Sequence, residues 1–241
     1  MKRLFGIVMF VLSFSGQAME SAVPMEDADV DVFDVSSVRR GAAFYANYCA
    51  GCHSIKHLRY SRIAKDLEVS EEDLRKDIMI GGAAIHESMI SGMAKVDGTN
   101  WFGVDPPDLS LVSRARGADW LYNYLKGFYV DPSAPTGVNN VVFPNVGMPN
   151  VLWELQGLQQ PVYKKEAGAG SVVERLQLAQ PGSMSSKEFD QAMTDLVNFL
   201  VYAGEPSQYD RLRLGKYVIF ALLLMVVLFY KLKKEYWKDI D

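Results

Sequence analysis

The sequence holds few of the residues that build most metal and catalytic centres. Its 241 residues include two cysteines, Cys49 and Cys52, and three histidines. A structural zinc site uses four ligands, mostly Cys and His, so zinc is a poor explanation of the pair. The chain also lacks a basic run or face between its two ends, and its net charge is −4. This composition predicts no nucleic-acid partner.

Two apolar segments at the ends of the chain account for much of its 49% hydrophobic content. At the N-terminus, two basic residues precede an apolar run over residues 4–14, and small residues follow at Gly16 and Ala18. This pattern predicts a signal peptide over residues 1–18, cleaved after Ala18. The alternative is a retained membrane anchor, for which the run is short.

The C-terminal run, Tyr217 to Tyr230, contains no charged residue. At about 1.5 Å per residue it is shorter than a ~30 Å hydrocarbon core. Leu214 and Leu232 extend it, and flanking lysines can reach the headgroups. We therefore predict a transmembrane anchor over residues 211–232; the alternative is a buried core helix.

The two ends together predict a single-pass protein of a bacterial inner membrane. Residues 19–210 then form an exported domain in the periplasm, held to the lipid bilayer by the anchor. Four lysines follow the apolar run and three basic residues precede it, which slightly favours a cytoplasmic tail over residues 233–241.

The two cysteines stand in the stretch "NYCAGCHSIKH", with His53 directly after Cys52. In an exported protein, C-x-x-C-H is typical of covalent attachment of one c-type haem. Two thiols add across the two vinyl groups, and the adjacent histidine supplies a nitrogen ligand to the iron. A thioredoxin-like redox pair would need a βαβ context, which the sequence does not show; a disulfide or chance spacing is a further alternative.

Two helices are predicted on either side of this motif. Gly41, Tyr45 and Cys49 fall on one face of the first, where a glycine permits a close helix crossing. The second follows residues 185–204, with a capping box of Ser185 and Glu188 and apolar residues at the helical period. This pattern predicts a mainly α fold that resembles the class I cytochromes c, with insertions and one C-terminal transmembrane helix.

The sixth iron ligand remains open on local pattern alone. A methionine sulfur would close the site and raise the reduction potential. Met148 in "NVGMPN" and Met184 in "QPGSMSSKE" both suit this position. His57 lies about one turn from His53, and His86 is expected to be a surface or core residue.

Several longer blocks resemble the cytochrome c1 family, the haem subunit of ubiquinol–cytochrome c reductase (the cytochrome bc1 complex). These blocks are "YCAGCHS", "PPDLSLVSRARGADWLYNYLKGFY", "PTGV" and "GMPNVLWELQG", followed by the closing helix and the C-terminal span. The resemblance covers nearly the whole mature chain.

The resemblance implies roles for individual residues. We take it to place the axial methionine just before the last core helix, at Met184, with Met148 in a family motif near the haem. A backbone carbonyl near Pro107 would accept the ring N–H of His53 and fix its tautomer. Arg114 and Arg116 would pair with the haem propionates; the alternative is two solvated arginines.

The chain departs from the family at two places. The loop "NNVVFPNV" before the "GMP" motif is short and contains no basic residue, so an arginine that faces a propionate in some relatives has no counterpart there. Residues 163–177 form a polar, glycine-containing excursion without signs of a phosphate loop.

The resemblance implies an electron-transfer subunit, not catalytic alone, that passes single electrons from the Rieske iron–sulfur protein to a soluble or tethered cytochrome c. Its span would pack against cytochrome b. The alternatives are a free-standing membrane-anchored electron shuttle, and a haem enzyme or gas sensor with an open iron site. The acidic residues of segment 20–34 are either a docking strip for a basic cytochrome c or a solvated leader.

Overall fold

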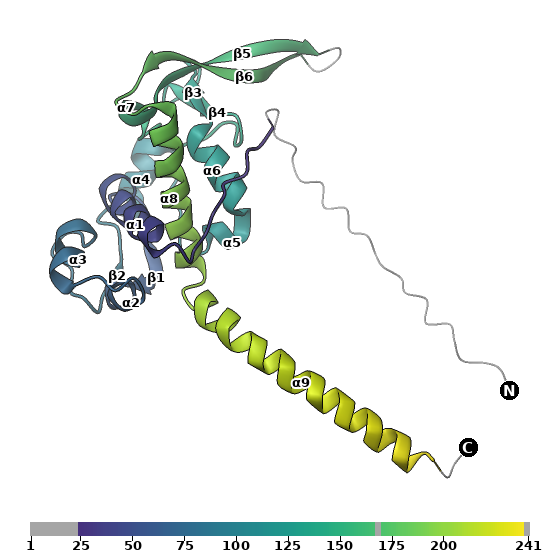
Figure 1. The fold of residues 1–241 in the computed structure, drawn as a ribbon. Coiled ribbons are helices and arrows are strands. Elements are labelled where there is room, and N and C mark those ends of the chain that lie inside the picture. Colours follow the sequence, from purple (N-terminus) through teal and green to yellow (C-terminus); the bar gives the residue numbers. More distant parts are fainter. Residues whose placement is uncertain (1–23, 167–169, 239–241) are drawn as a thin grey trace.

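The computed structural model describes residues 24–166 and 170–238, so the predicted signal peptide lies outside the described part. The helices and strands, in chain order, are α1 (Val35–Tyr48), β1 (Ile55–Arg59), α2 (Tyr60–Asp66), α3 (Glu71–Asp77), β2 (Ser88–Met89), α4 (Lys95–Phe102), α5 (Val112–Arg116), α6 (Ala118–Lys126), β3 (Phe128–Val130), β4 (Val138–Asn140), α7 (Trp153–Gln156), β5 (Gly157–Glu166), β6 (Gly170–Pro181), α8 (Ser186–Gly204) and α9 (Gln208–Tyr236). Figure 1 shows a mainly helical head from which α9 projects.

The centre of the head is the crossing of α1 and α8. A Cβ built on Gly41 would lie 1.9 Å from the carbonyl oxygen of Asp195, so only glycine permits this approach. Tyr45 and Phe199 fill the crossing, with ring centroids 5.5 Å apart. The close crossing predicted from Gly41 and Tyr45 is confirmed.

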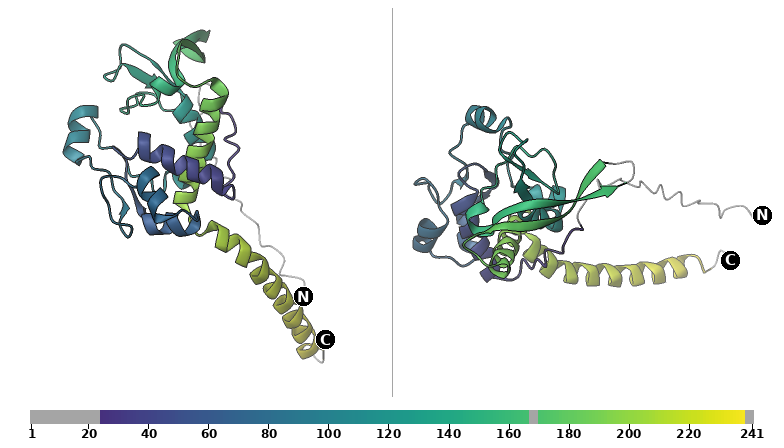
Figure 2. Two further views of the ribbon diagram at one scale, coloured as in Figure 1. Left: turned by 60° about the vertical axis from the view of Figure 1, so that its left-hand side comes forward. Right: turned by 90° about the horizontal axis from the view of Figure 1, so that it is seen from above.

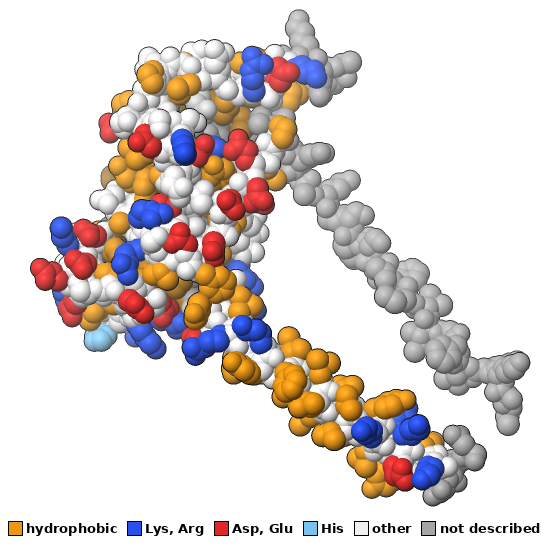
Figure 3. Space-filling model, viewed as in Figure 1, with side chains coloured by type: hydrophobic (Ala, Val, Ile, Leu, Met, Phe, Trp, Pro, Cys, Tyr) orange, Lys and Arg blue, Asp and Glu red, His pale blue; other side chains and the backbone are white. Residues whose placement is uncertain are grey.

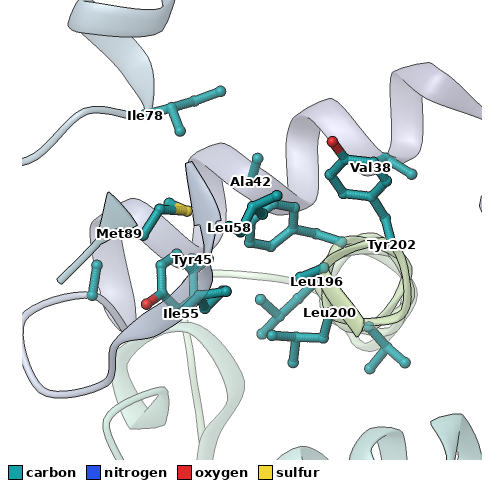
Figure 4. Packing of buried hydrophobic residues seen from close by; sticks show 14 of the residues in the cluster. Val38, Ala42, Tyr45, Ile55, Leu58, Ile78, Met89, Leu196, Leu200 and Tyr202 are labelled. Carbon is teal, nitrogen blue, oxygen red and sulfur yellow. The ribbon is translucent and has the colours of Figure 1, made fainter. Parts of the chain in front are cut away.

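Buried side chains from both helices form one core with the β1 region (Figure 4). Val38 and Ala42 of α1 belong to this core together with Leu196 and Leu200 of α8. Helix α8 begins with the predicted capping box, in which Ser185 and Glu188 each bond the other's backbone, and it ends at Gly204. Both ends of the predicted second helix are therefore confirmed.

A buried polar cluster fixes the register of the same crossing. Asp195 accepts hydrogen bonds from the Ser37 hydroxyl (2.6 Å) and the Arg40 guanidinium (2.6 and 2.8 Å). Asn198 donates to Ser37 (2.7 Å). Buried polar groups that lose a partner are costly, so these bonds favour one alignment of α1 on α8.

The strands within the described residues form three antiparallel pairs, β1–β2, β3–β4 and β5–β6. None of these pairs is a parallel βαβ unit, which removes the context that a thioredoxin-like cysteine pair needs. The predicted polar excursion is the β5–β6 hairpin, whose register runs from Gly157 opposite Pro181 to Glu166 opposite Gly170. Figure 2 shows this long hairpin extending over the head.

The segment before α1 lies against the head. Glu26 pairs with Lys126 (2.5 Å), the N–H of Ala28 donates to Asp119 (3.0 Å), and Asp34 caps α1. Glu26 and Asp34 therefore have structural roles.

Helix α9 has a mean hydropathy of 2.2 over its most apolar window and buries none of that window in the head. Its length and composition suit a membrane span, and its exposure removes the alternative of a core helix. The helix extends beyond the predicted anchor, residues 211–232, at both ends.

Candidate haem-binding site

The C-x-x-C-H motif forms one tight turn at the end of α1. The carbonyl of Cys49 accepts hydrogen bonds from the N–H groups of Cys52 (3.1 Å) and His53 (2.9 Å), while the Cys49 N–H caps α1 by bonding to Tyr45. The Tyr45 hydroxyl in turn donates to the His53 carbonyl. Both cysteines are free and partly buried, so the pair is not a disulfide.

This turn opens into an apolar cleft whose walls come from three parts of the chain. The lining residues are Tyr48, Cys49, Cys52, His53, Phe102, Val104, Pro106, Pro107, Met148, Pro149 and Val151. A Cβ on Gly98 would lie 2.5 Å from Pro106, and one on Gly147 would lie 2.9 Å from Val104. These two glycines let α4, the double proline and the Met148 loop close around the motif.

The proline segment holds the histidine in one orientation. The Pro107 carbonyl lies 2.8 Å from the Nδ1 atom of His53, the contact that the family resemblance implies. A proton on Nδ1 donates to this carbonyl and leaves Nε2 free to bind a metal. Burial lowers the pKa of His53, which keeps the imidazole in the neutral form that metals bind.

Asp108 fixes the proline segment against the motif. Its carboxylate accepts from the N–H groups of Lys56 and Ser110 (both 3.0 Å), and the N–H of Leu109 donates to the Ser54 carbonyl (2.8 Å). Burial alone would raise the pKa of Asp108, but hydrogen bonds from Ser110 and Lys56 lower it overall. The carboxylate is therefore ionised at neutral pH.

The two candidate methionines occupy different places. Met148 lines the cleft with His53. Met184 does not; it packs half-buried against the hydrophobic core, and its N–H donates to the Leu155 carbonyl of α7 (3.1 Å). The neighbouring Gly182 is also tight against α7, where a Cβ would lie 2.2 Å from the Leu155 oxygen. Met184 binding to the iron stays a prediction, and Met148, which lines the cleft, is the alternative.

Tyr124, which the sequence analysis missed, contacts this methionine. Its hydroxyl donates to the Met148 sulfur across 3.3 Å. The ring is held by Trp120, stacked at 5.0 Å with an interplanar angle of 8°, and by the edge of Phe128. The spacing of Trp120 and Tyr124 in the sequence could have predicted this stack, because aromatic residues four positions apart meet on one helix face.

The two arginines have separate surroundings. Arg114 forms an ion pair with Glu205 (2.7 Å). Arg116 lies over the rings of Trp120 (5.0 Å) and Phe143 (5.8 Å), and no ion pair of Arg116 occurs among the described residues. Neither arginine lines the cleft itself.

The cleft suits an attached porphyrin. Burial raises the pKa of the Cys49 thiol to about 12, so the thiol stays protonated there. The walls between the thiols, His53 and Met148 are aliphatic, aromatic or proline side chains, which can enclose an apolar macrocycle. His57 and His86 are exposed and lie outside this cleft.

Comparison with known proteins gives one family. The Cytochrome C1 family model matches residues 25–88 and 94–240. The chain is 47% identical to the cytochrome c1 of Allochromatium vinosum over 90% of this chain and 89% of that protein. It is 43% identical to a Nitrosomonas europaea protein named ammonia monooxygenase gamma subunit, over 96% and 93%. It is 28% identical to the mitochondrial cytochrome c1 haem protein of Neurospora crassa, over 85% and 63%.

The match includes the residues of the cleft and of α9, and it leaves out residues 89–93. Proteins of this family carry a covalently bound c-type haem and serve as electron-transfer subunits of the cytochrome bc1 complex, anchored in the membrane by a C-terminal helix. The chain belongs to the cytochrome c1 family.

Proposed function

We propose that this chain holds one haem c through Cys49 and Cys52, with His53 and Met184 as its iron ligands. The observation that carries this proposal is the apolar cleft that the C-x-x-C-H turn shares with the Pro107-bound His53. Membership of the family supports Met184 as the second ligand, and Met148, which lines the cleft, is the alternative.

The haem supplies a one-electron iron couple, and the protein sets its potential and access. Pro107 fixes His53, so this ligand keeps its position when the charge of the site changes. The apolar walls exclude water from the ligands. Two filled axial positions leave no open position for a substrate, which separates this site from a haem enzyme or gas sensor.

We further propose that Arg116 faces a haem propionate. Arg114 is engaged by Glu205, whereas the Arg116 guanidinium lies over Trp120, the ring that stacks on Tyr124. Because Tyr124 bonds to Met148, this chain of contacts brings a cation close to the Met148 wall of the cleft. A fixed positive charge there favours the reduced state of the iron and balances an anionic propionate.

The head receives single electrons from the Rieske iron–sulfur protein and passes them to a soluble or tethered cytochrome c. The exposed residues Val104 and Val151 at the cleft give one edge of the site access to partners. We propose that α9 crosses a bacterial inner membrane beside cytochrome b, with the class I cytochrome c-like head in the periplasm and the C-terminus in the cytoplasm.

Blue-native electrophoresis of membranes with haem staining tests this function. We expect a haem-stained band at the size of a complex, and denaturing gels of that band should yield this chain with cytochrome b and the Rieske protein. A stained band at the size of the single chain would instead support a free-standing electron shuttle. Absence of covalent haem on this chain would contradict the proposal outright.

A further inference from the structure

A basic groove opens where the head meets α9, away from the haem cleft. It is lined by five cationic or titratable side chains, those of His57, Arg59, Arg62, Lys65 and His86. Ser207, at the start of α9, closes the groove. Its volume is about 570 Å³, and no carboxylate lies among its lining residues. Figure 3 shows Lys and Arg side chains gathered along this lower edge of the head.

The positively charged side chains of the groove differ in whether they already pair with a carboxylate of the chain. Arg62 pairs with Asp66 and donates to the Pro206 carbonyl (3.0 Å), so it forms a wall that joins α2 to the start of α9. Arg59 and Lys65 are exposed, and neither has an ion pair within residues 24–166 and 170–238. The groove therefore offers at least two uncompensated positive charges to an anion.

The position of the groove along α9 matches the headgroup layer of a membrane. A ~30 Å hydrocarbon core corresponds to about 20 residues of helix, which reaches from Leu232 back to Leu212. Ser207 lies five residues beyond Leu212, or about 7.5 Å further along the axis. Since each headgroup layer is roughly 5–8 Å deep, the groove lies at the level of lipid phosphates.

We propose that this groove binds the headgroup phosphate of an anionic phospholipid of the periplasmic leaflet. Arg and Lys side chains match phosphate oxygens. The apolar surface of α9 directly below, including exposed Leu212 and Leu214, gives the acyl chains a surface to pack on. A free phosphate ion would lack this second contact. The proposal rests on the proposed membrane anchoring through α9.

The test uses the haem-loaded full chain in nanodiscs of mixed phosphatidylglycerol and phosphatidylcholine, with retained lipids counted by native mass spectrometry. The groove variant is Arg59→Gln with Lys65→Gln. Its matched control removes the same charge far from the membrane, as Lys164→Gln with Lys187→Gln. We expect the wild type and the control to retain phosphatidylglycerol in preference to phosphatidylcholine. Each neutralised groove cation should weaken this retention by about 5-fold.

Three outcomes would overturn the proposal. The groove variant could retain phosphatidylglycerol as well as the control does. Inorganic phosphate could displace the lipid from the wild type, which would make the groove a site for a free anion. The groove variant could keep its lipid but lose cytochrome b on purification, which would make the groove a protein contact. An unchanged haem spectrum in the groove variant separates each outcome from a failure of the electron-transfer proposal.

Discussion

Replacing Tyr124 with phenylalanine tests which methionine binds the iron. The Tyr124 hydroxyl donates to the Met148 sulfur across 3.3 Å. With Met184 as the ligand, this bond does not reach an iron-bound atom, so its loss should leave the reduction potential of the haem nearly unchanged. On an iron-bound Met148, the bond would weaken donation from the sulfur to the oxidised iron, and its loss would lower the potential.

The size of the effect follows from the strength of the hydrogen bond. A net contribution of about 0.5–1.5 kcal/mol corresponds to roughly 20–60 mV for a one-electron couple. This range is an upper limit, because only the part of the bond energy that differs between the two oxidation states shifts the potential. Phenylalanine keeps the stacking on Trp120 and the contact with Phe128, so packing should change little.

The assay is an equilibrium redox titration of the full chain, followed by its haem absorption. Tyr122→Phe is the matched control, since Tyr122 lies in the same helix but its hydroxyl accepts from Lys126. We expect equal potentials in Tyr124→Phe and Tyr122→Phe. A potential lower by roughly 20–60 mV in Tyr124→Phe would refute the assignment of Met184 and show that Met148 binds the iron.

Four further outcomes follow from the structure. Gly41→Ala should destabilise the head by about 1–3 kcal/mol in chemical denaturation, since the new methyl would overlap the Asp195 carbonyl. Gly51→Ala is the control, because a Cβ there meets nothing within 4 Å. Equal stability of the two variants would contradict the close crossing. Cys49→Ser with Cys52→Ser should make the haem extractable by acid acetone, and resistant haem would refute thioether attachment. Arg116→Gln should lower the potential more than Arg114→Gln does, and the reverse order in redox titration would exclude Arg116 as the propionate partner. Folding lowers the pKa of Asp108, so its ionised carboxylate stabilises the fold at pH values above the unfolded pKa near 3.8, and this stabilisation is lost as the pH falls through the lower folded pKa. Asp108→Asn should therefore lose this pH-dependent part of the free energy of unfolding. An unchanged dependence of stability on pH would show that the carboxylate does not hold the proline segment.

The sequence predicted those features that local pattern and spacing determine. The periodicity around Gly41 and the capping box at Ser185 predicted the two crossing helices, and charge-free Tyr217 to Tyr230 predicted the apolar helix. The C-x-x-C-H spacing predicted covalent attachment of a c-type haem, because this motif is local in the chain. The contact of His53 with Pro107 was expected from the resemblance alone, since it joins residues far apart in sequence.

Local pattern left the choice of methionine open, and only the resemblance favours Met184. Both methionines follow a glycine-containing segment near a proline, so their sequence surroundings are alike. What separates them is tertiary: Gly147 packs on Val104 at the cleft, whereas Gly182 packs on Leu155 of α7. The basic groove was likewise invisible, because His57 and Lys65 meet His86 and Ser207 only in the folded chain.

The central claim is that His53 and Met184 bind the iron of a haem attached to Cys49 and Cys52. The most direct test is the sulfur-to-iron charge-transfer band of the oxidised protein, compared in Met184→Leu and Met148→Leu. We predict that the band disappears in Met184→Leu, with a lower potential and carbon monoxide binding in the reduced state, and that it persists in Met148→Leu. Loss of the band in Met148→Leu and its retention in Met184→Leu would contradict the account.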